Sequence, residues 1–294
     1  MFVIVGAPGA EEYGKSFTHS ATLWQQAGAK TVMIGMDQST NALAQLRQRL
    51  TAEPKDSSAE LWLVLLGHGT FDGKEAKFNL RGSDLSAAEL ASLLQPFRRP
   101  MAIINCAASS GPFIKALSAT NRVVITATKS GHEQNYARFG QFISEAISNP
   151  QADLDKDGQT SLLEAFLAAS SHVAEFYKSE GRLATEHALL DDNGDGLGTP
   201  ADWFRGVRAV KKPAGGAALD GMRAHQFHLV RSETERALPA TWRARRDELE
   251  RRLTQLRDSK ADQTEEDYYQ KLEEILFHLA QLYKNAPNGT NQPP

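Results

Sequence analysis

Short apolar runs rich in β-branched residues alternate with segments of helical periodicity over the first two-thirds of the chain. This alternation is typical of a mostly parallel sheet covered by helices. The expected strands are Phe2–Val5, Thr31–Ile34, Leu61–Leu66, Met101–Ile104 and Val123–Thr128. The expected helices are Phe17–Gln26, Asn41–Leu50, Ala87–Leu94, Pro112–Leu117 and Tyr136–Ile147. The sequence therefore predicts an α/β domain over residues 1–210.

Composition excludes several classes of protein. With 294 residues, 41% of them hydrophobic, the chain is long enough to build a substantial core. A net charge of −3 lacks the basic footprint of a general nucleic-acid binder, and no apolar run approaches the ~18 residues of a membrane span. The single cysteine, Cys106, rules out an intramolecular disulfide.

The N-terminus bears on localisation. Phe2–Gly6 has the character of a core strand and lacks a basic leader, so no signal peptide is expected. A strand at residue 2 would also follow from trimming of a native leader. That reading favours an extracytoplasmic location, periplasmic or secreted, over a cytoplasmic one, and the compartment stays open.

The composition changes near residue 210. Residues 211–237, which include Lys-Lys-Pro-Ala-Gly-Gly, are expected to be a linker, 238–286 a helical hairpin and 287–294 a disordered tail. Apolar residues recur at heptad-like spacing at Trp242, Leu249, Leu253, Leu256, Tyr269, Leu272, Leu276, Leu279 and Tyr283. Residues 241–260 carry 7 − 4 = +3 charges and residues 261–284 carry 2 − 6 = −4, so two antiparallel helices would attract. The hairpin is either plain packing, or a coiled coil that binds a partner or inhibits the preceding domain.

A phosphate-binding loop is one candidate motif. Gly9-Ala10-Glu11-Glu12-Tyr13-Gly14-Lys15-Ser16 matches the spacing and lies between an expected strand and helix. Glu11 and Glu12 would oppose a phosphate there, and no later strand ends in a magnesium-binding Asp. A nucleotide hydrolase is therefore the weakest of the alternatives.

Two neighbouring strand ends carry the most chemistry. His68 follows the strand at 61–66, and Cys106 follows the strand at 101–104. Parallel strands end at the same sheet edge, where ligands bind, so an imidazole and a thiol would share one crevice. A histidine can act as acid and base for a cysteine nucleophile. The alternative is a buried cysteine and a structural histidine.

These residues resemble the legumain-like and caspase-like cysteine peptidases. The resemblance rests on Gly67-His68-Gly69 and Ile104-Asn105-Cys106, with Ser109-Ser110-Gly111 following, and extends to Asp84–Leu94 and Val124–Ser130. It covers about residues 1–180 and implies a three-layer caspase-like sandwich with Cys106 as nucleophile, His68 as acid and base, and the N–H groups of Gly69 and Cys106 as oxyanion donors. Ser130, His132, Glu133 and, more loosely, Lys15 correspond to substrate-pocket positions. Legumain-like enzymes usually have Ser-Gly sooner after the cysteine, whereas Ala107-Ala108 intervene here.

Two loops have the pattern of an EF-hand calcium site. The first places oxygen ligands at Asp153, Asp155, Asp157, Gln159, Ser161 and Glu164, with Gly158 at the turn. The second repeats it with Asp191, Asn193, Asp195, Leu197 and Asp202, although Pro200 interrupts it. The alternative for each is a capped turn without metal. Calcium would stabilise these loops rather than join the chemistry.

The function expected from the sequence is a cysteine endopeptidase that hydrolyses protein or peptide substrates through His68 and Cys106. A catalytically inactive calcium-binding scaffold of the same fold is the alternative. Cleavage specificity and oligomeric state stay open.

Overall fold

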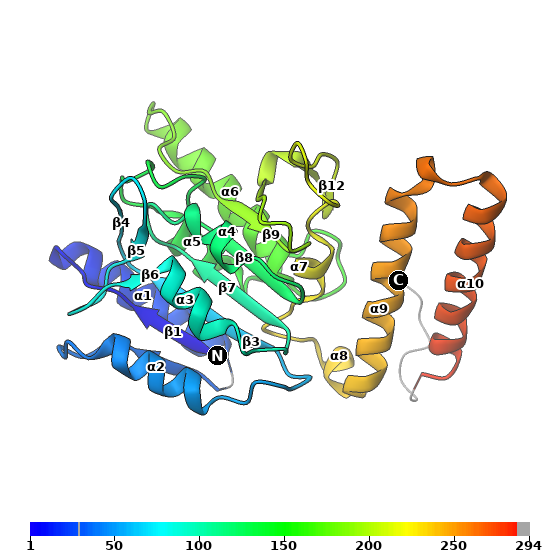
Figure 1. Cartoon of the computed structure of the whole chain (residues 1–294), viewed down its shortest axis with the longest axis horizontal. Helices are drawn as coiled ribbons and strands as arrows, with labels where there is room; N and C mark the ends of the chain where they lie inside the picture. The colour runs from blue at the N-terminus through cyan, green and yellow to red at the C-terminus, as the bar shows by residue number, and fades with distance from the viewer. Residues whose placement is uncertain (29, 287–294) are drawn as a thin grey trace. The chain divides into compact units, whose positions relative to one another are not determined.

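The computed structural model describes residues 1–28 and 30–286. The chain divides into two compact units: residues 1–154 with 160–230, and residues 231–294 with the short segment 155–159. In Figure 1 the first unit runs from blue to yellow, and the second is the orange and red helical hairpin. The expected tail, 287–294, lies outside the described residues.

A seven-stranded sheet organises the first unit. Its order is β10-β9-β8-β7-β3-β1-β2, in which β2, β1, β3, β7 and β8 are parallel and β9 and β10 are antiparallel additions at one edge. The strands are β1 (Phe2–Val5), β2 (Val32–Ile34), β3 (Leu61–Leu66), β7 (Met101–Asn105), β8 (Arg122–Thr126), β9 (Leu189–Asp191) and β10 (Thr199–Pro200). The fully buried strands are continuous apolar runs, as expected of a sheet covered on both faces.

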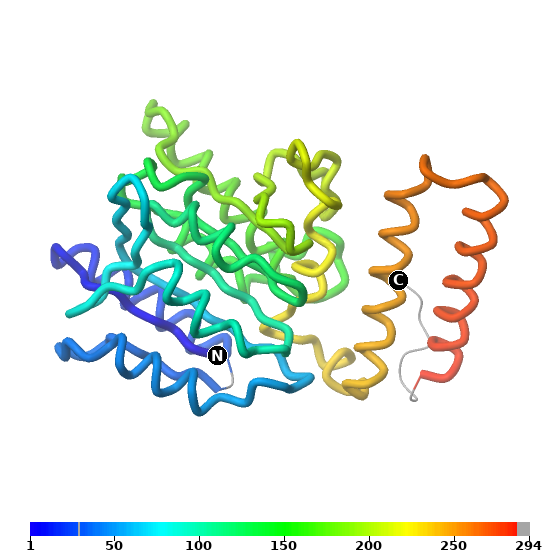
Figure 2. Tube along the Cα trace, viewed as in Figure 1, coloured from blue at the N-terminus to red at the C-terminus, as the bar shows by residue number. Residues whose placement is uncertain are grey.

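Helices cover both faces of this sheet (Figures 1 and 2). One core holds side chains such as Val64, Trp24 and Phe166, and the other holds Leu63, Leu46 and Leu90. The first layer comprises α1 (Glu11–Ala27), α5 (Phe139–Ala146), α6 (Leu162–Ser179) and α7 (Met222–Gln226), and the second α2 (Ala42–Ala52), α3 (Ala87–Leu94) and α4 (Pro112–Leu117). The predicted three-layer α/β sandwich with a mostly parallel sheet is confirmed, and this is the arrangement expected of a caspase-like fold.

Smaller elements complete the first unit. A three-stranded sheet of β4 (Gly69–Phe71), β5 (Ala76–Phe78) and β6 (Leu85–Ser86) follows β3 directly. The other short elements are η1 (Pro150–Ala152), η2 (Ala201–Trp203), β11 (Phe204–Arg205) and β12 (Arg208–Ala209). None of the described helices is long and apolar enough to span a membrane.

Most of the expected linker at 211–237 packs against the first unit instead of forming a free connection. Residues up to Val230 belong to the first unit, where Ala224 is fully buried and the Phe227 ring lies 5.8 Å from that of Trp62. The backbone also joins the core, because the N–H of Leu162 donates to the carbonyl of Phe227 at 2.8 Å. The glycines and proline of this stretch suggest mobility, but apolar residues beyond them anchor it.

The second unit is the predicted helical hairpin. It comprises α8 (Glu233–Ala237), α9 (Ala240–Asp258), η3 (Lys260–Asp262) and α10 (Glu265–Lys284), and Gln159 accepts a hydrogen bond from the Ser232 N–H. Its buried core is Leu256, Tyr268 and Ile275, with Leu253, Leu272 and Leu279 against it. The Trp242 indole donates to the Leu282 carbonyl at 3.1 Å.

The register of α10 differs from the sequence prediction. Tyr269 and Leu276 were expected in the seam, yet they are 50% and 45% exposed, whereas Tyr268 and Ile275 are buried. Apolar residues occupy two adjacent stripes of this helix, and only one of them can face α9. The heptad therefore predicts a hairpin correctly but assigns two of its contacts to the wrong residues.

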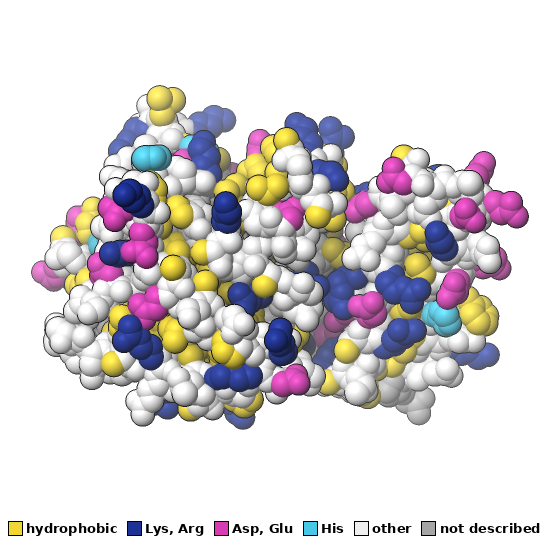
Figure 3. Space-filling model, in the orientation of Figure 1, with side chains coloured by type: hydrophobic (Ala, Val, Ile, Leu, Met, Phe, Trp, Pro, Cys, Tyr) yellow, Lys and Arg dark blue, Asp and Glu magenta, His cyan; other side chains and the backbone are white. Residues whose placement is uncertain are grey.

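Charged side chains of both signs are scattered over the face of the molecule drawn in Figure 3. Basic residues there are interspersed with acidic ones. The near-balanced composition, 33 Lys and Arg against 36 Asp and Glu, is consistent with this view.

Candidate active-site region

The strand ends that carry His68 and Cys106 are adjacent, as predicted. Strand β3 pairs in parallel with β7, with Leu65 opposite Asn105, so the two loops leave the same edge of the sheet. The loop after β3 turns at once into β4, and His68 lies at this turn. Both residues therefore lie at the same edge of the sheet. What the two side chains can do chemically depends on the direction in which each one points.

His68 lies in an aromatic enclosure. Its ring centroid is 4.9 Å from Tyr13, 5.1 Å from Phe17 and 6.0 Å from Tyr136. Its Nε2 atom is 3.1 Å from the carbonyl oxygen of Pro8. A carbonyl oxygen only accepts, so Nε2 carries the proton and Nδ1 is the basic nitrogen of the neutral ring. The enclosure fixes both the orientation and the tautomer of His68.

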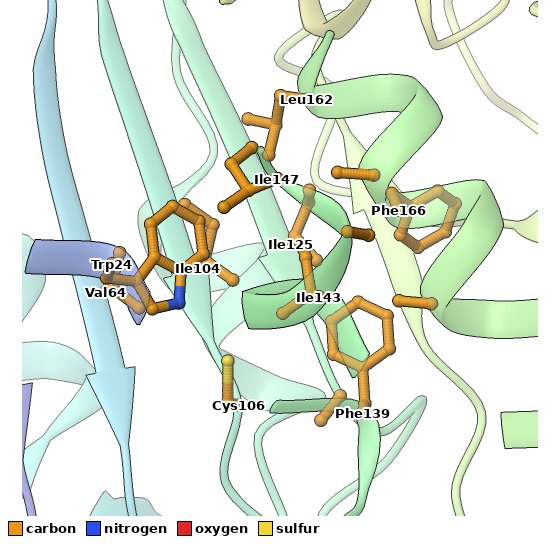
Figure 4. Close-up of a cluster of buried hydrophobic side chains, with 14 of the residues drawn as sticks. Trp24, Val64, Ile104, Cys106, Ile125, Phe139, Ile143, Ile147, Leu162 and Phe166 are labelled. Carbon is orange, nitrogen blue, oxygen red and sulfur yellow. The ribbon is translucent and has the colours of Figure 1, made fainter. Parts of the chain in front are cut away.

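Cys106 is part of the hydrophobic core. It is 3% exposed and belongs to the cluster that includes Trp24, Ile104 and Ile143. Figure 4 shows its sulfur on the side of these apolar side chains. Side chains alternate along β7, so Cys106 shares the face of Ala102 and Ile104, whereas Ile103 and Ala107 belong to the opposite core. The strand's own periodicity directs the thiol under α1 and α5.

Helix α5 closes the space over the thiol. A Cβ placed on Gly140 would lie 2.7 Å from the Cys106 Cβ and 3.5 Å from its Sγ. The cavity that Cys106 lines, together with Ser16 and Phe17, holds about 10 Å³, the room of at most one water. A peptide carbonyl has no access to the sulfur in this arrangement.

The chemistry of Cys106 follows from this burial. Burial in the core raises the pKa of the thiol far above its usual range, and the negative charge of Glu186 raises it further. The thiol is the form present at neutral pH, whereas the thiolate is the nucleophile. The backbone N–H of Cys106 donates to the Leu65 carbonyl at 2.9 Å, so the predicted oxyanion role of this N–H is contradicted.

The chain that approaches the histidine loop is Ala107–Ala108. A Cβ on Gly69 would lie 2.1 Å from the Ala108 carbonyl oxygen and 3.2 Å from the Ala107 Cβ, which explains the glycine after His68. Ser109 follows with φ of 56°, a left-handed conformation unusual for serine. Its hydroxyl is buried and has no hydrogen-bond partner among the described residues. No sequence pattern predicts this left-handed serine.

The expected substrate-pocket residues mostly hold the loops together. Glu133 accepts from the N–H groups of Lys129 and His187, and its Oε1 lies 2.5 Å from His187 Nδ1. The His132 ring packs edge-on against Phe71 at 5.2 Å. Ser130 accepts from the His132 N–H at 3.3 Å. These contacts join the loop after β8 to β4 and to the residues before β9.

Lys15 lies on helix α1, away from the loop after β8 that holds Ser130, His132 and Glu133. The position of this helix also shows that the phosphate-loop prediction is wrong. Helix α1 begins at Glu11, so Gly14-Lys15-Ser16 lies in its second turn rather than in a loop that wraps an anion. The Lys15 ammonium pairs with Glu11 at 2.7 Å, with both side chains exposed. Glu11 and Glu12 are good helix formers, and their negative charge suits the first turn of a helix, so the helix begins within the motif.

The first calcium loop has a compact carboxylate cluster. Oxygen atoms of Asp153, Asp155 and Asp157 lie within 4.8 Å of one another. Glu164 lies in the first turn of α6, where its carboxylate accepts from the Ser161 N–H at 2.8 Å and from the Leu154 N–H at 2.7 Å. The pattern of a capped helix after an acidic loop is the one that the EF-hand sequence requires.

The second loop is tied up internally. Asp191 accepts from Gly194 and Gly196, Asn193 accepts from Asp195, and Asp195 accepts from Leu197. Position 12, Asp202, lies in η2, after β10 has paired with β9. A carboxylate that the sequence did not single out, Asp220, accepts from the Asp192 N–H and the Thr199 hydroxyl. Burial, together with the charge of Asp192, raises the pKa of Asp220 to about 8.

Glu186 is a further residue that sequence reasoning missed. Its carboxylate is 2% exposed and accepts from the N–H groups of Arg138 and Phe139 at the start of α5, and from the Tyr177 hydroxyl. Burial raises its pKa despite these hydrogen bonds. No motif surrounds it, so only the fold brings it to the helix terminus.

No protein-family model matches this sequence, and no curated protein matches it. Among solved structures, the chain is similar to the Drosophila initiator caspase Dronc, with 15% identity and a TM-score of 0.45, over 66% of this chain and 79% of that one. It is also similar to protein GSU0716 from Geobacter sulfurreducens, with 12% identity and a TM-score of 0.42, over 65% of this chain and 92% of that one. Neither likeness identifies an activity for this chain.

Proposed function

We propose that this chain is a non-catalytic, calcium-binding scaffold built on a caspase-like fold. The observation that carries the proposal is the burial of the Cys106 thiol in the core beneath α5. A thiol peptidase needs its sulfur as an accessible thiolate near a base. Here the pKa of the thiol is raised, and the adjoining cavity admits no substrate.

The histidine by itself does not supply hydrolysis. Its Nδ1 atom is a base, but Ala107–Ala108 is the segment against Gly69, and an alanine side chain has no nucleophilic atom. The intervening alanines noted in the sequence are therefore the residues at the histidine loop. A scaffold keeps the loop geometry because the packing of Tyr13, Phe17 and Tyr136 around His68 also stabilises the fold.

Calcium binding at 153–164 is the second part of the proposal. Carboxylates of Asp153, Asp155 and Asp157 form the cluster, the Gln159 carbonyl and Ser161 hydroxyl complete the loop, and Glu164 follows at position 12. Oxygen donors are the ligands that calcium prefers, and the bound ion would offset repulsion among the carboxylates. The second loop, 191–202, is a weaker site because Pro200 interrupts it and its position 12 is the shorter carboxylate of Asp202, which lies in η2.

A cysteine endopeptidase is the alternative, favoured by the succession of His68-Gly69 and Cys106 at neighbouring strand ends. It requires α5 to move away from Cys106 when substrate or calcium binds. In that case the C-terminal hairpin is a candidate inhibitory segment; in the scaffold it is a candidate partner-binding segment.

Peptide turnover separates the two functions. The full-length protein is incubated with a fluorogenic peptide library, with calcium and with chelator, beside Cys106→Ala. The proposal predicts equal background rates for both proteins in both conditions. Turnover by the native protein that disappears in Cys106→Ala establishes the peptidase and refutes the scaffold.

Thermal unfolding tests the calcium site. Calcium at a hundredfold excess over its Kd should stabilise the folded protein by about 2.7 kcal/mol, and the variant Asp155→Asn/Asp157→Asn should lose this gain. Glu175→Gln, an exposed change on α6 outside the loop, is the matched control. An equal calcium response in all three proteins contradicts the assignment of the ion to this loop.

A further inference from the structure

A cavity of about 550 Å³ lies at the carboxyl ends of β1 and β2, apart from the Cys106 cavity. Val5 and Gly6 line it from the end of β1, and Gly35 and Met36 from the end of β2. Parallel strands β1 and β2 pair directly, and the carboxyl edge of such a sheet is where α/β proteins bind ligands. The cavity size suits a small molecule.

Cationic groups outnumber anionic ones around this cavity. Lys15 and Arg81 line it as cations, and Glu11 is the only lining carboxylate in the described chain. Glu11 is already paired with the Lys15 ammonium at 2.7 Å. One guanidinium nitrogen of Arg81, Nη1, is buried without a hydrogen-bond partner among the described residues. Such a donor loses hydration and gains nothing in return, so a ligand acceptor there would restore its hydrogen bond.

The remaining wall is apolar. Phe17 and Val5 are buried, and Met36 is 42% exposed although it is a large hydrophobic residue. Arg81 makes no ion pair among the described residues, although the exposed carboxylate of Asp37 lies near enough to interact with it electrostatically. The guanidinium therefore balances at most one negative charge of a ligand, and Glu11 would repel a polyphosphate. We propose that this cavity binds a small organic acid with a single carboxylate on Arg81 and an apolar chain against Phe17 and Met36.

The cavity also adjoins His68. Pro8 lines it, and the Pro8 carbonyl accepts from His68 Nε2 at 3.1 Å. Phe17 lines it as well, and the Phe17 ring packs against the imidazole. The His68 ring and the Met36 methyl group are therefore two independent NMR reporters of occupancy.

The test titrates hexanoate into the full-length protein and follows these two signals. Hexanamide, which lacks the negative charge, tests whether binding needs the carboxylate. Inorganic phosphate, which lacks the hydrocarbon chain, tests whether binding needs the apolar part of the ligand. Arg81→Gln removes the charge of the carboxylate-binding side chain, and Arg49→Gln, an exposed change on α2, is the matched control. Signals of residues outside the cavity report whether each variant is folded, and Lys15→Gln serves as a second charge variant.

We expect saturable shifts with hexanoate, and a Kd for Arg81→Gln that is weaker by about tenfold or more, as for loss of a charge-assisted hydrogen bond. Arg49→Gln should match the native protein, and hexanamide should bind the native protein about tenfold more weakly or worse. No saturable shift, equal hexanoate binding by Arg81→Gln, or equal binding of hexanamide overturns the site. Phosphate binding as tight as that of hexanoate overturns the assigned ligand class.

Discussion

At the scale of single residues, the close contact of Gly140 with Cys106 keeps the thiol buried. It is the second residue of α5, and its missing side chain lets the helix backbone lie directly on Cys106. A glycine at this position costs helix propensity, which the close packing offsets. The thiol is therefore inaccessible because of a specific contact between two residues.

Gly140→Ala should destabilise the first unit. Its Cβ would lie 2.7 Å from that of Cys106, and overpacking of a filled core costs about 1–3 kcal/mol. Gln141→Ala, the neighbouring change on the same helix, should cost less than about 0.5 kcal/mol. Denaturant unfolding measures both. A neutral or stabilising Gly140→Ala would mean that α5 does not press on Cys106.

Glu186 makes stability depend on pH. Because burial raises its pKa in the folded state, folding favours the protonated acid, and its contribution is most favourable at pH below the unfolded value. That contribution is lost as pH rises through the raised pKa. The unfolding free energy of the native protein, relative to Glu186→Gln, should therefore fall as the pH rises above the unfolded Glu pKa of about 4.3.

Denaturant unfolding of both proteins as a function of pH tests the Glu186 account. Gln retains an oxygen that accepts from Arg138 and Phe139, so the comparison isolates the charge. A relative stability that rises with pH would mean that the hydrogen bonds outweigh burial and lower the pKa of Glu186.

At the scale of elements, hydrophobic periodicity predicts which residues are buried where an element has one apolar face. It does not predict them where two adjacent faces are apolar. Strands β1 and β3 and helices α3 and α4 have the predicted bounds, because each is a short apolar run between turn residues. The register of α10 was missed because Tyr268 and Tyr269, and Ile275 and Leu276, are adjacent apolar pairs. Which stripe packs depends on α9, a partner that periodicity alone does not include.

The α10 register has a matched pair of variants. Ile275→Ala should destabilise the hairpin by about 2–5 kcal/mol, because it opens a cavity in a small core. Leu276→Ala, at a site 45% exposed, should cost less than about 1 kcal/mol. Denaturant unfolding followed by far-UV circular dichroism compares them. The reverse order would restore the heptad predicted from the sequence.

The sequence predicted the place of the candidate site in the fold but not the burial of its thiol. Strand order brings His68 and Cys106 to one edge, and the sequence shows both strands. Alternation along β7 was the available signal for the thiol, since Ala102, Ile104 and Cys106 share one face. Helix α5, which covers that face, and the carboxylate of Glu186 are 34 or more residues from Cys106 in the sequence. No local sequence pattern reveals contacts over such a separation.

At the scale of the whole molecule, the two units have separate hydrophobic cores. Cys106 belongs to the first, and Leu256, Tyr268 and Ile275 form the second. Access to the thiol therefore requires opening of the first unit, and destabilising the hairpin does not provide it. Exposure of the thiol therefore reports on opening of the packing between the central sheet and α5.

Alkylation of Cys106 in the folded protein tests the central claim most directly. The single cysteine makes the labelling unambiguous, and mass spectrometry gives the rate with and without calcium. We expect labelling at least about 10³-fold slower than in the unfolded chain, as for a core residue exposed only on opening, and an unchanged rate in Ile275→Ala. Labelling of the folded protein at a rate near that of the unfolded chain would contradict the account, because it would place an accessible thiol where the structure has a core.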